Sequence, residues 1–149
     1  MGNVLWPLLG ILAGAAFAVQ APVNAALARG LGLPVAAAAV SFFVGAVALA
    51  LVTALVTSAD GLSLQWRAPA LWLFIVGGLL GASVVTCSVI LAPKIGAAAL
   101  MACLISGQLL AGIALDRIGF LGLAVREISL GRIAGALLLL AGALMIRIY

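Results

Sequence analysis

Two amide side chains, Gln20 and Asn24, lie four residues apart within the first long apolar segment of the sequence. Residues at this spacing share one face of a helix. An amide buried in lipid without a hydrogen-bond partner is costly, so both must face other protein or a wet cavity. Pro22 lies between them, removes a backbone donor and predicts a kink in the helix. This polar step is the first candidate for a binding site.

The two amides belong to a longer helical stripe. At spacings of four and three residues, this stripe comprises Trp6, Gly10, Ala13, Phe17, Gln20 and Asn24. Small residues, an aromatic ring and two amides on one face are expected of a cavity wall beside a packing seam. The same amides could instead form interhelical hydrogen bonds that join the spans. The sequence supports both interpretations, and we name Phe17, Gln20 and Asn24 as candidate substrate-binding residues.

Polar residues in two other apolar segments extend this candidate site. Ser41 and Phe42 lie in the second segment, where a serine can also bond back to its own helix. Phe42 and Phe43 point to different faces, so at most one of them would contact a substrate. Gln108, in the fourth segment, is the strongest polar residue outside the first, with an interhelical hydrogen bond as the alternative role. We therefore predict Ser41, Phe42 and Gln108 as further substrate-binding residues.

Acidic residues are confined to the edges of the apolar segments. Asp116 lies on one stripe with Gln108 and Gly112, at the end of the fourth segment. It could couple transport to an ion, or it could be a structural cap or an ion-pair partner of the adjacent Arg117. No Asp, Glu, Lys, Arg or His lies in the middle of any apolar segment, whereas proton-coupled exporters usually carry an embedded acid. An uncharged, amide-lined site fits a neutral or zwitterionic ligand better than a lone cation.

The composition identifies an integral membrane protein. Of the 149 residues, 68% are hydrophobic and 7% are charged, against about 25% charged residues in soluble domains. The few basic residues are scattered, which argues against a nucleic-acid partner. With no His, and with Cys87 and Cys103 in apolar runs, we expect no disulfide framework, metal or cofactor. No phosphate-binding loop or nucleophile elbow is present, so we expect no enzyme activity.

Five segments have the roughly 20 apolar residues that a membrane span needs. We predict an all-α integral membrane protein with one transmembrane domain over 1–149 and spans at about 4–26, 34–56, 70–91, 97–115 and 128–146. The segment 118–126 is either a loop or a short interfacial helix. Small-xxx-small glycine pairs predict close helix packing. These pairs are Gly10 and Gly14, Gly77 and Gly81, and Gly131 and Gly135.

The distribution of basic residues hardly favours one orientation of the chain in the membrane over the other. An odd number of spans puts the termini on opposite sides of the membrane, and the positive-inside rule needs an excess of Lys and Arg on one side. The N-terminal side carries four, Arg67, Arg117, Arg126 and Arg132, and the other side carries three, Arg29, Lys94 and Arg147. We therefore expect dual topology; the alternative is that Arg132 and Arg147 are assigned to the wrong sides and that one orientation prevails. Two antiparallel copies of five helices would form a ten-helix inverted repeat, an architecture common among secondary transporters.

Several short motifs follow one another along almost the whole chain. They are Gln20-Ala-Pro-Val-Asn24-Ala-Ala-Leu27, Ser41-Phe-Phe-Val-Gly45, Ala92-Pro-Lys-Ile-Gly-Ala97, Ser106-Gly-Gln108, Asp116-Arg-Ile-Gly119 and Arg132-Ile-Ala-Gly135. With this ordered set, the chain resembles the YdcZ-like small membrane proteins of the drug/metabolite transporter superfamily. The resemblance implies five spans, a bacterial cytoplasmic (inner) membrane location and relatives that occur as paired or fused halves. Small multidrug exporters of that superfamily carry an acid in the first span. This chain has Gln20 and Asn24 there, so their proton exchange does not carry over.

The sequence thus predicts a secondary transporter that exports a small organic molecule. It would work as an antiparallel dimer with a second copy of itself or a sister chain, around a midplane site of amides and aromatics. A small dual-topology ion channel and a non-transporting accessory subunit of the membrane are the alternatives.

Overall fold

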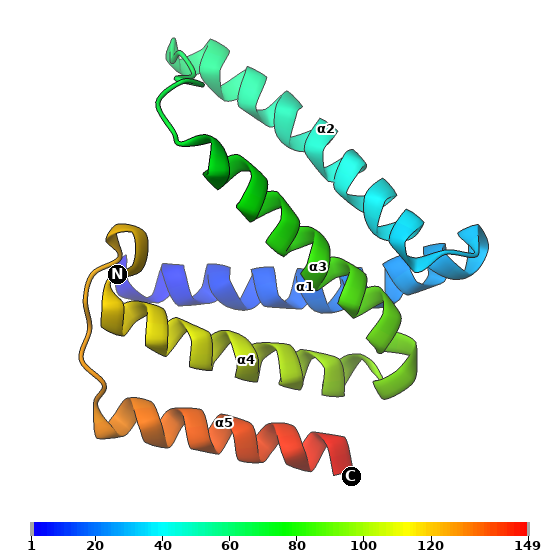
Figure 1. Ribbon diagram of the computed structural model, residues 1–149, viewed down its shortest axis with the longest axis vertical. Coiled ribbons are helices and arrows are strands. Elements are labelled where there is room, and N and C mark those ends of the chain that lie inside the picture. Colours follow the sequence, from blue (N-terminus) through cyan, green and yellow to red (C-terminus); the bar gives the residue numbers. More distant parts are fainter. Residues whose placement is uncertain (1, 149) are drawn as a thin grey trace. The chain divides into compact units, whose positions relative to one another are not determined.

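The computed structural model describes residues 2–148, with side chains from Val4 onward, and every regular element in this range is helical. Along the chain (Figure 1) these elements are α1 (Gly2–Leu31), α2 (Pro34–Asp60), α3 (Leu71–Ile95), α4 (Ala97–Ile118), the short 3₁₀ helix η1 (Phe120–Gly122) and α5 (Leu130–Ile148). All five α-helices are long and apolar enough to cross a membrane. The predicted all-α class with five such helices is confirmed.

Several helices extend beyond the apolar stretches that predicted them. The first ends at Leu31 rather than near residue 26, and the third ends at Ile95 rather than near residue 91. Helical hydrogen bonding does not stop where hydropathy falls, because polar residues near a span end also form helix. α1 continues through Pro22 without a break, and α3 continues through Pro93. Only Gly96, at φ +82°, then separates α3 from α4.

The chain divides into two compact units, with the boundary between Pro93 and Lys94. The first unit holds α1, α2 and most of α3, and the second holds α4, η1 and α5. Each unit carries its own set of polar side chains, and the two are described separately below.

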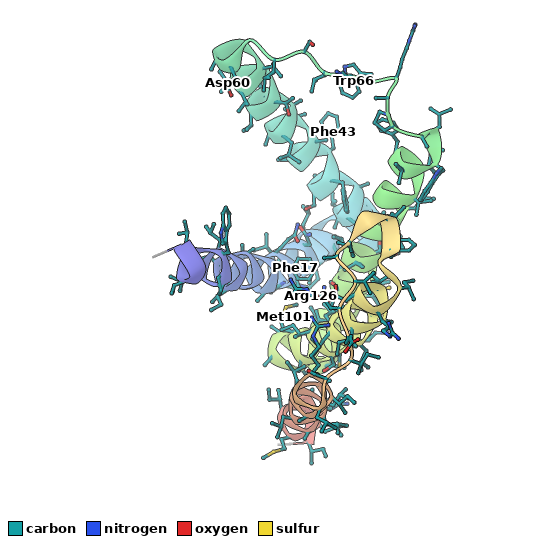
Figure 2. All side chains as sticks on the ribbon, turned by 90° about the vertical axis from the view of Figure 1, so that its left-hand side faces the viewer. Phe17, Phe43, Asp60, Trp66, Met101 and Arg126 are labelled. Carbon is teal, nitrogen blue, oxygen red and sulfur yellow. The ribbon has the colours of Figure 1, made fainter. Side chains whose placement is uncertain are left out.

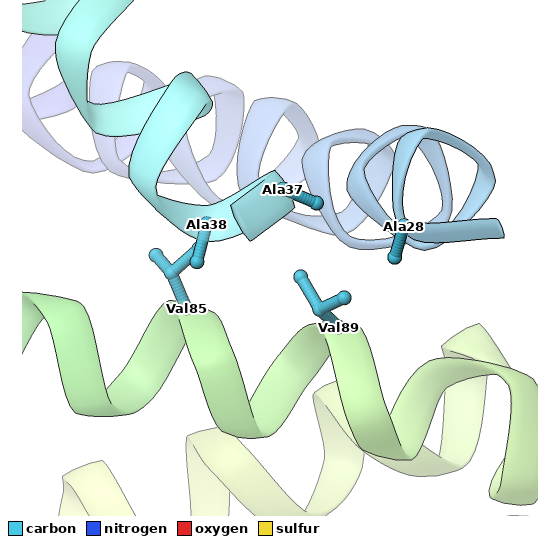
Figure 3. Close-up of a cluster of buried hydrophobic side chains, with 5 residues drawn as sticks. All are labelled: Ala28, Ala37, Ala38, Val85 and Val89. Carbon is cyan, nitrogen blue, oxygen red and sulfur yellow. The ribbon is translucent and has the colours of Figure 1, made fainter. Parts of the chain in front are cut away.

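Small residues form the core of the first unit. α1 and α2 pack against each other. The buried cluster consists of Ala28, Ala37, Ala38, Val85 and Val89, with Leu27 against it. Figure 3 shows the alanines of α1 and α2 opposite the two valines of α3. Alanines let helix backbones approach closely, so this contact depends on van der Waals packing rather than on bulky side chains.

One end of α2 carries the polar and aromatic groups expected at a membrane surface. α2 ends at Asp60, and Gly61 caps it in the left-handed conformation at φ +62°. Figure 2 shows Asp60 at this end, Trp66 on the segment that follows and Phe43 farther back along the helix. Trp66 is 70% exposed, and tryptophan prefers the membrane interface because its ring is amphipathic.

In the second unit, α4 and α5 pack against each other and the connecting segment turns back on α4. Gly119 ends α4 at φ +63°, and the Arg126 N–H donates to the Asp116 carbonyl oxygen at 3.0 Å. The predicted loop or interfacial helix at 118–126 consists of the end of α4, a turn at Gly119, the short 3₁₀ helix η1 and irregular chain over 123–126. Ser129 precedes α5, and its hydroxyl accepts a hydrogen bond from the Arg132 N–H at 3.3 Å. This N-cap contact places Arg132 in the first turn of α5.

Most large apolar side chains lie on the outside of the chain. Leu71 is 80% exposed and Leu130 is 87% exposed, and such residues occur along all five α-helices. A continuous apolar surface of this extent marks contact with lipid or with another chain rather than with water. The helices therefore form a multi-pass membrane protein.

Among the predicted packing glycines, Gly81 makes a close contact with another helix of the first unit. A Cβ added at Gly81 would lie 3.3 Å from the Phe42 ring of α2. A Cβ at Gly131 would meet only the Ser129 hydroxyl oxygen, at 3.9 Å. At the other four positions, a Cβ would meet no neighbouring atom within 4 Å; these are Gly10, Gly14, Gly77 and Gly135. Their role in helix packing stays a prediction.

Candidate functional site

Asn24 links α1 to α2 by a side-chain hydrogen bond. Its Nδ2 donates to the Ser41 Oγ at 3.2 Å, and Asn24 is only 4% exposed. The alternative in which Ser41 bonds to its own helix is not found in the described chain. By contrast, the Ser88 and Ser106 hydroxyls do bond to carbonyl oxygens four residues earlier, each at 2.7 Å. Of the two roles that the sequence left open for Asn24, the geometry therefore shows the interhelical hydrogen bond.

Beside this link, a groove of about 280 Å³ opens between α1 and α2. Its lining residues are Gln20, Ser41, Phe42, Gly45, Ala46 and Leu49. Gln20 is half-buried, and its side-chain amide makes no hydrogen bond within the described part of the chain. The volume is near the lower end of ligand pockets, roughly 300–1,000 Å³. The groove thus offers a free amide and an aromatic ring to a small ligand.

Phe17 does not line this groove. It borders a gap without room for a water molecule, which lies among residues of α1 and α3: Phe17, Gln20, Ala21, Asn24, Val85, Ser88 and Val89. Gln20 borders both the groove and this gap. The structure thus brings Gln20, Ser41 and Phe42 together at the groove, and it places Phe17 and Asn24 at the neighbouring gap.

The second unit has a groove of its own, of about 360 Å³, between α4 and α5. It is lined by Gln108, Leu109, Gly112, Ile113, Asp116, Arg132 and Gly135. Gln108 is exposed, and its side chain makes no hydrogen bond within residues 4–148. The predicted stripe of Gln108, Gly112 and Asp116 therefore lines one wall of this groove.

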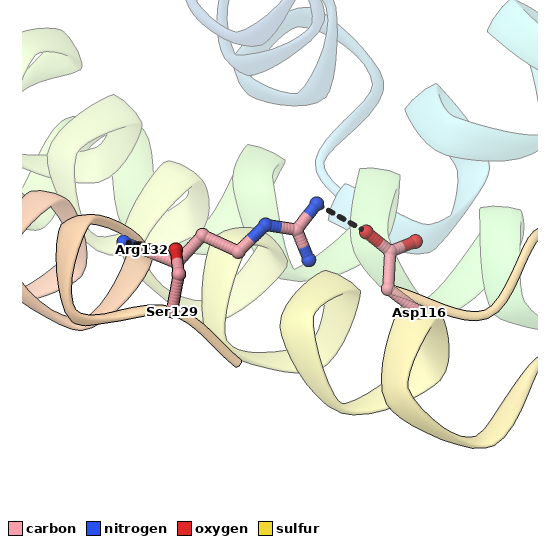
Figure 4. Close-up of polar contacts among 3 residues, drawn as sticks. All are labelled: Asp116, Ser129 and Arg132. Atoms are coloured by element: carbon pink, nitrogen blue, oxygen red, sulfur yellow. Dashed lines mark hydrogen bonds and ion pairs between the residues drawn. The ribbon is translucent and has the colours of Figure 1, made fainter. Parts of the chain in front are cut away.

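Asp116 forms its ion pair with Arg132, not with Arg117 as the sequence suggested. The Arg132 Nη2 donates to the Asp116 Oδ2 at 3.0 Å (Figure 4). The two side chains are 28% and 32% exposed, respectively. Adjacent residues on a helix point in different directions, so Arg117 cannot easily face Asp116. α5 instead brings Arg132 across the groove.

The sequence did not predict Arg132 as a site residue, because this residue was used only as an orientation charge and as part of a family motif. Two signals could have found it. An acid and an arginine stand at facing ends of consecutive apolar segments that a short connection joins. In addition, a serine directly before an apolar run is a common helix N-cap. Ser129 therefore predicts where α5 begins, and it places Arg132 in the first turn of that helix.

The α1/α2 groove offers hydrogen-bonding groups, and the α4/α5 groove adds an ion pair. Within the described residues, no group of three or more His, Cys, Asp or Glu side chains could hold a metal ion. Cys87 and Cys103 are free and exposed thiols. The side chains that line the grooves are suited to binding a ligand.

Comparison with known proteins gives one match. The family described as "Putative inner membrane exporter, YdcZ" matches residues 5–145, a range that covers nearly all of the five α-helices. No curated protein and no solved structure matches the chain. The five apolar helices and this nearly full-length match place the protein in the inner membrane as a multi-pass protein, and the chain belongs to the YdcZ family.

Proposed function

We propose that this protein is a secondary transporter that exports a small neutral or zwitterionic organic molecule, bound in the α1/α2 groove. The observation that carries the proposal is the contrast between two amides one helical turn apart. The Asn24 amide donates a hydrogen bond to Ser41, whereas the Gln20 amide has no partner in the described chain and borders an open groove. An unpaired amide within a membrane span needs a partner, because lipid supplies none.

The chemistry of the groove indicates the class of ligand. Gln20 offers two N–H donors and a carbonyl acceptor, and the Ser41 hydroxyl oxygen can accept a second hydrogen bond. Phe42 is 41% exposed and offers a ring face to an apolar part of the ligand. None of the lining residues is charged. A ligand with a net charge would enter this groove without a counter-ion, so a molecule without net charge fits better.

We further propose that two copies, or this chain and a sister chain, work as an antiparallel pair. The nearly even distribution of basic residues over the two sides supports dual insertion. The extensive apolar surface and the glycines without close neighbours offer area for a second chain. Ten helices with an inverted-repeat relation would then alternate access by exchanging the conformations of the two protomers. Gln108 and Asp116 remain proposed site residues, for ligand contact and for ion coupling.

A ligand screen followed by a flux assay tests the proposed transport. Purified protein is screened for thermal stabilisation against neutral, zwitterionic and cationic small molecules, and each stabilising compound is then loaded into proteoliposomes. We expect saturable efflux of neutral or zwitterionic compounds and no unitary currents in bilayer recordings. Unitary currents would show a channel instead. The absence of both flux and current for every stabilising compound would contradict the transporter proposal.

The antiparallel arrangement is tested separately by orientation. Tags at both termini are labelled in intact cells with a reagent that does not cross the membrane. We expect each terminus to be labelled in a substantial part of the population. If every molecule has the same orientation, the antiparallel homodimer is wrong, and only a pair with a sister chain remains.

A further inference from the structure

The ion pair in the α4/α5 groove leaves most of the Arg132 guanidinium without a partner. A guanidinium has five N–H donors, and a carboxylate can accept two of them side by side. Here only one hydrogen bond joins the two residues, from Nη2 to Oδ2. The Arg132 Nη1 is buried and has no hydrogen-bond partner within the described chain.

This unpartnered nitrogen is unusual for a folded protein. Buried polar groups are nearly always hydrogen-bonded, and an orphaned charged donor is more costly than a neutral one. A buried donor with a positive charge is best satisfied by the oxygen of an anion. Gln108 lines the same groove and adds an amide whose N–H groups have no partner among the described residues.

The position of the charges indicates where such an anion would come from. Asp116 lies two residues before the end of α4, and Arg132 is the third residue of α5. Both charges therefore lie near helix ends, where water and lipid headgroups meet the membrane. Gln108 lies two turns farther along α4, roughly 12 Å away. Between these polar ends the groove is lined by Leu109, Ile113 and two glycines.

We propose that the α4/α5 groove binds an amphiphile whose oxyanion, a phosphate or a carboxylate, accepts hydrogen bonds from Arg132. The oxyanion occupies the charged end of the groove, and a short apolar body lies along Leu109 and Ile113 toward Gln108. Since Nη1 is covered, the guanidinium turns about its Cδ–Nε bond to meet the anion while Nη2 stays with Asp116. This site is distinct from the α1/α2 groove and does not depend on the function proposed for it.

The same oxyanion chemistry could be carried by a soluble amphiphile or by a phospholipid headgroup. Both are tested with full-length protein in maltoside micelles, which contain no phosphate. The soluble probe is octyl phosphate, with octanol as its uncharged match. The lipid probe is phosphatidylglycerol, with diacylglycerol as its match. Stabilisation against heat is titrated for each probe.

The variants compare Arg132→Lys with Arg147→Lys. Lysine at position 132 keeps the positive charge and can still pair with Asp116, but it lacks the forked second nitrogen. Arg147 lies near the other end of α5, outside the groove, so its replacement shows the effect of losing a guanidinium group elsewhere on the same helix. Gln108→Leu provides a second variant that keeps the ion pair.

We expect octyl phosphate to stabilise the wild type at lower concentration than octanol does, with about a tenfold loss of apparent affinity in Arg132→Lys. Arg147→Lys should bind like the wild type, and Gln108→Leu should bind more weakly.

The two probes then identify the source of the oxyanion. If phosphatidylglycerol stabilises the protein at a much lower concentration than octyl phosphate does, the ligand is a lipid. If octyl phosphate acts at the lower concentration, the ligand is a soluble amphiphile. If neither anionic probe exceeds its uncharged match, the proposal is wrong. It is also wrong if both Arg132→Lys and Gln108→Leu bind like the wild type. If Arg132→Lys does not fold, unchanged binding by Gln108→Leu is enough to reject it.

Discussion

The two grooves of this protein are lined by different kinds of polar group. The α1/α2 groove has an amide, a hydroxyl and an aromatic ring but no charge, whereas the α4/α5 groove has an acid and an arginine. In each unit one polar contact joins two helices: Asn24 with Ser41, and Arg132 with Asp116. In each unit a further polar group stays unpartnered within the described chain.

The position of these groups along their helices explains the difference. Gln20 and Asn24 lie well inside the 30-residue α1, whereas Asp116 and Arg132 lie within a turn of helix ends. A charge at the centre of a bilayer costs far more than an amide does. The chain therefore keeps neutral groups at depth and charged groups near the membrane surface, and the two grooves are suited to different ligands.

The largest effect should come from breaking the ion pair of the second unit. Asp116→Ala leaves the half-buried Arg132 guanidinium without the carboxylate that it contacts at 3.0 Å, and we expect the free energy of unfolding to fall by about 1–3 kcal/mol. Titration with a denaturing detergent measures this change. The double variant Asp116→Ala, Arg132→Ala removes both charges and should recover part of the loss. Equal stability of Asp116→Ala and wild type would show that the pair contributes nothing.

Gln20→Leu should act on transport rather than on stability. The variant introduces an apolar side chain of similar size and removes the amide from the groove. We expect efflux of a stabilising ligand to fall about tenfold, the effect of one lost hydrogen bond to a ligand. Thermal stability should stay at or above that of the wild type.

Val19→Ala is the matched control for Gln20→Leu. Val19 is the preceding residue on α1, is 63% exposed and does not line the groove. Its efflux should stay close to that of the wild type. If Gln20→Leu transports as well as Val19→Ala, the α1/α2 groove is not the site of ligand binding.

Asn24 and Ser41 should show a smaller coupling. Asn24→Ala and Ser41→Ala each remove one side of the 3.2 Å hydrogen bond. Interhelical hydrogen bonds in membrane proteins contribute on average about 0.6 kcal/mol and at most about 1.7 kcal/mol. A double-mutant cycle on the free energy of unfolding should give a coupling in this range. No coupling would mean that Asn24 has a different role, and a loss of efflux without loss of stability would favour ligand contact.

The smallest effect should separate two glycines of α3. Gly81→Ala places a Cβ 3.3 Å from the Phe42 ring, so the ring must move by a few tenths of an ångström. Gly77→Ala meets no neighbour within 4 Å in this chain. We expect Gly81→Ala to be less stable than Gly77→Ala by a few tenths of a kcal/mol to about 1 kcal/mol. If Gly77→Ala is the more harmful substitution in the assembled protein, Gly77 has a packing partner outside the first unit.

The sequence by itself determined the class of this protein and its family. Its apolar segments are long enough to span a bilayer, and only helices satisfy their own backbone there without a partner segment. The five helices followed directly, although their ends did not, because hydropathy does not detect where helical hydrogen bonds stop. Gln20, Asn24 and Gln108 stood out for the same reason: amides are rare in such segments.

Only the tertiary structure decided which of these polar side chains have a partner on another helix and which do not. It joined Asn24 to Ser41 and left Gln20 free, although both amides share one helix face. It also paired Asp116 with Arg132, sixteen residues away, rather than with the neighbouring Arg117. The pattern of one helix shows which residues share a face, but a hydrogen bond between helices depends on the packing of the second helix. That packing is set by contacts of small residues, such as the alanines of α1 and α2, whose partners the sequence does not specify.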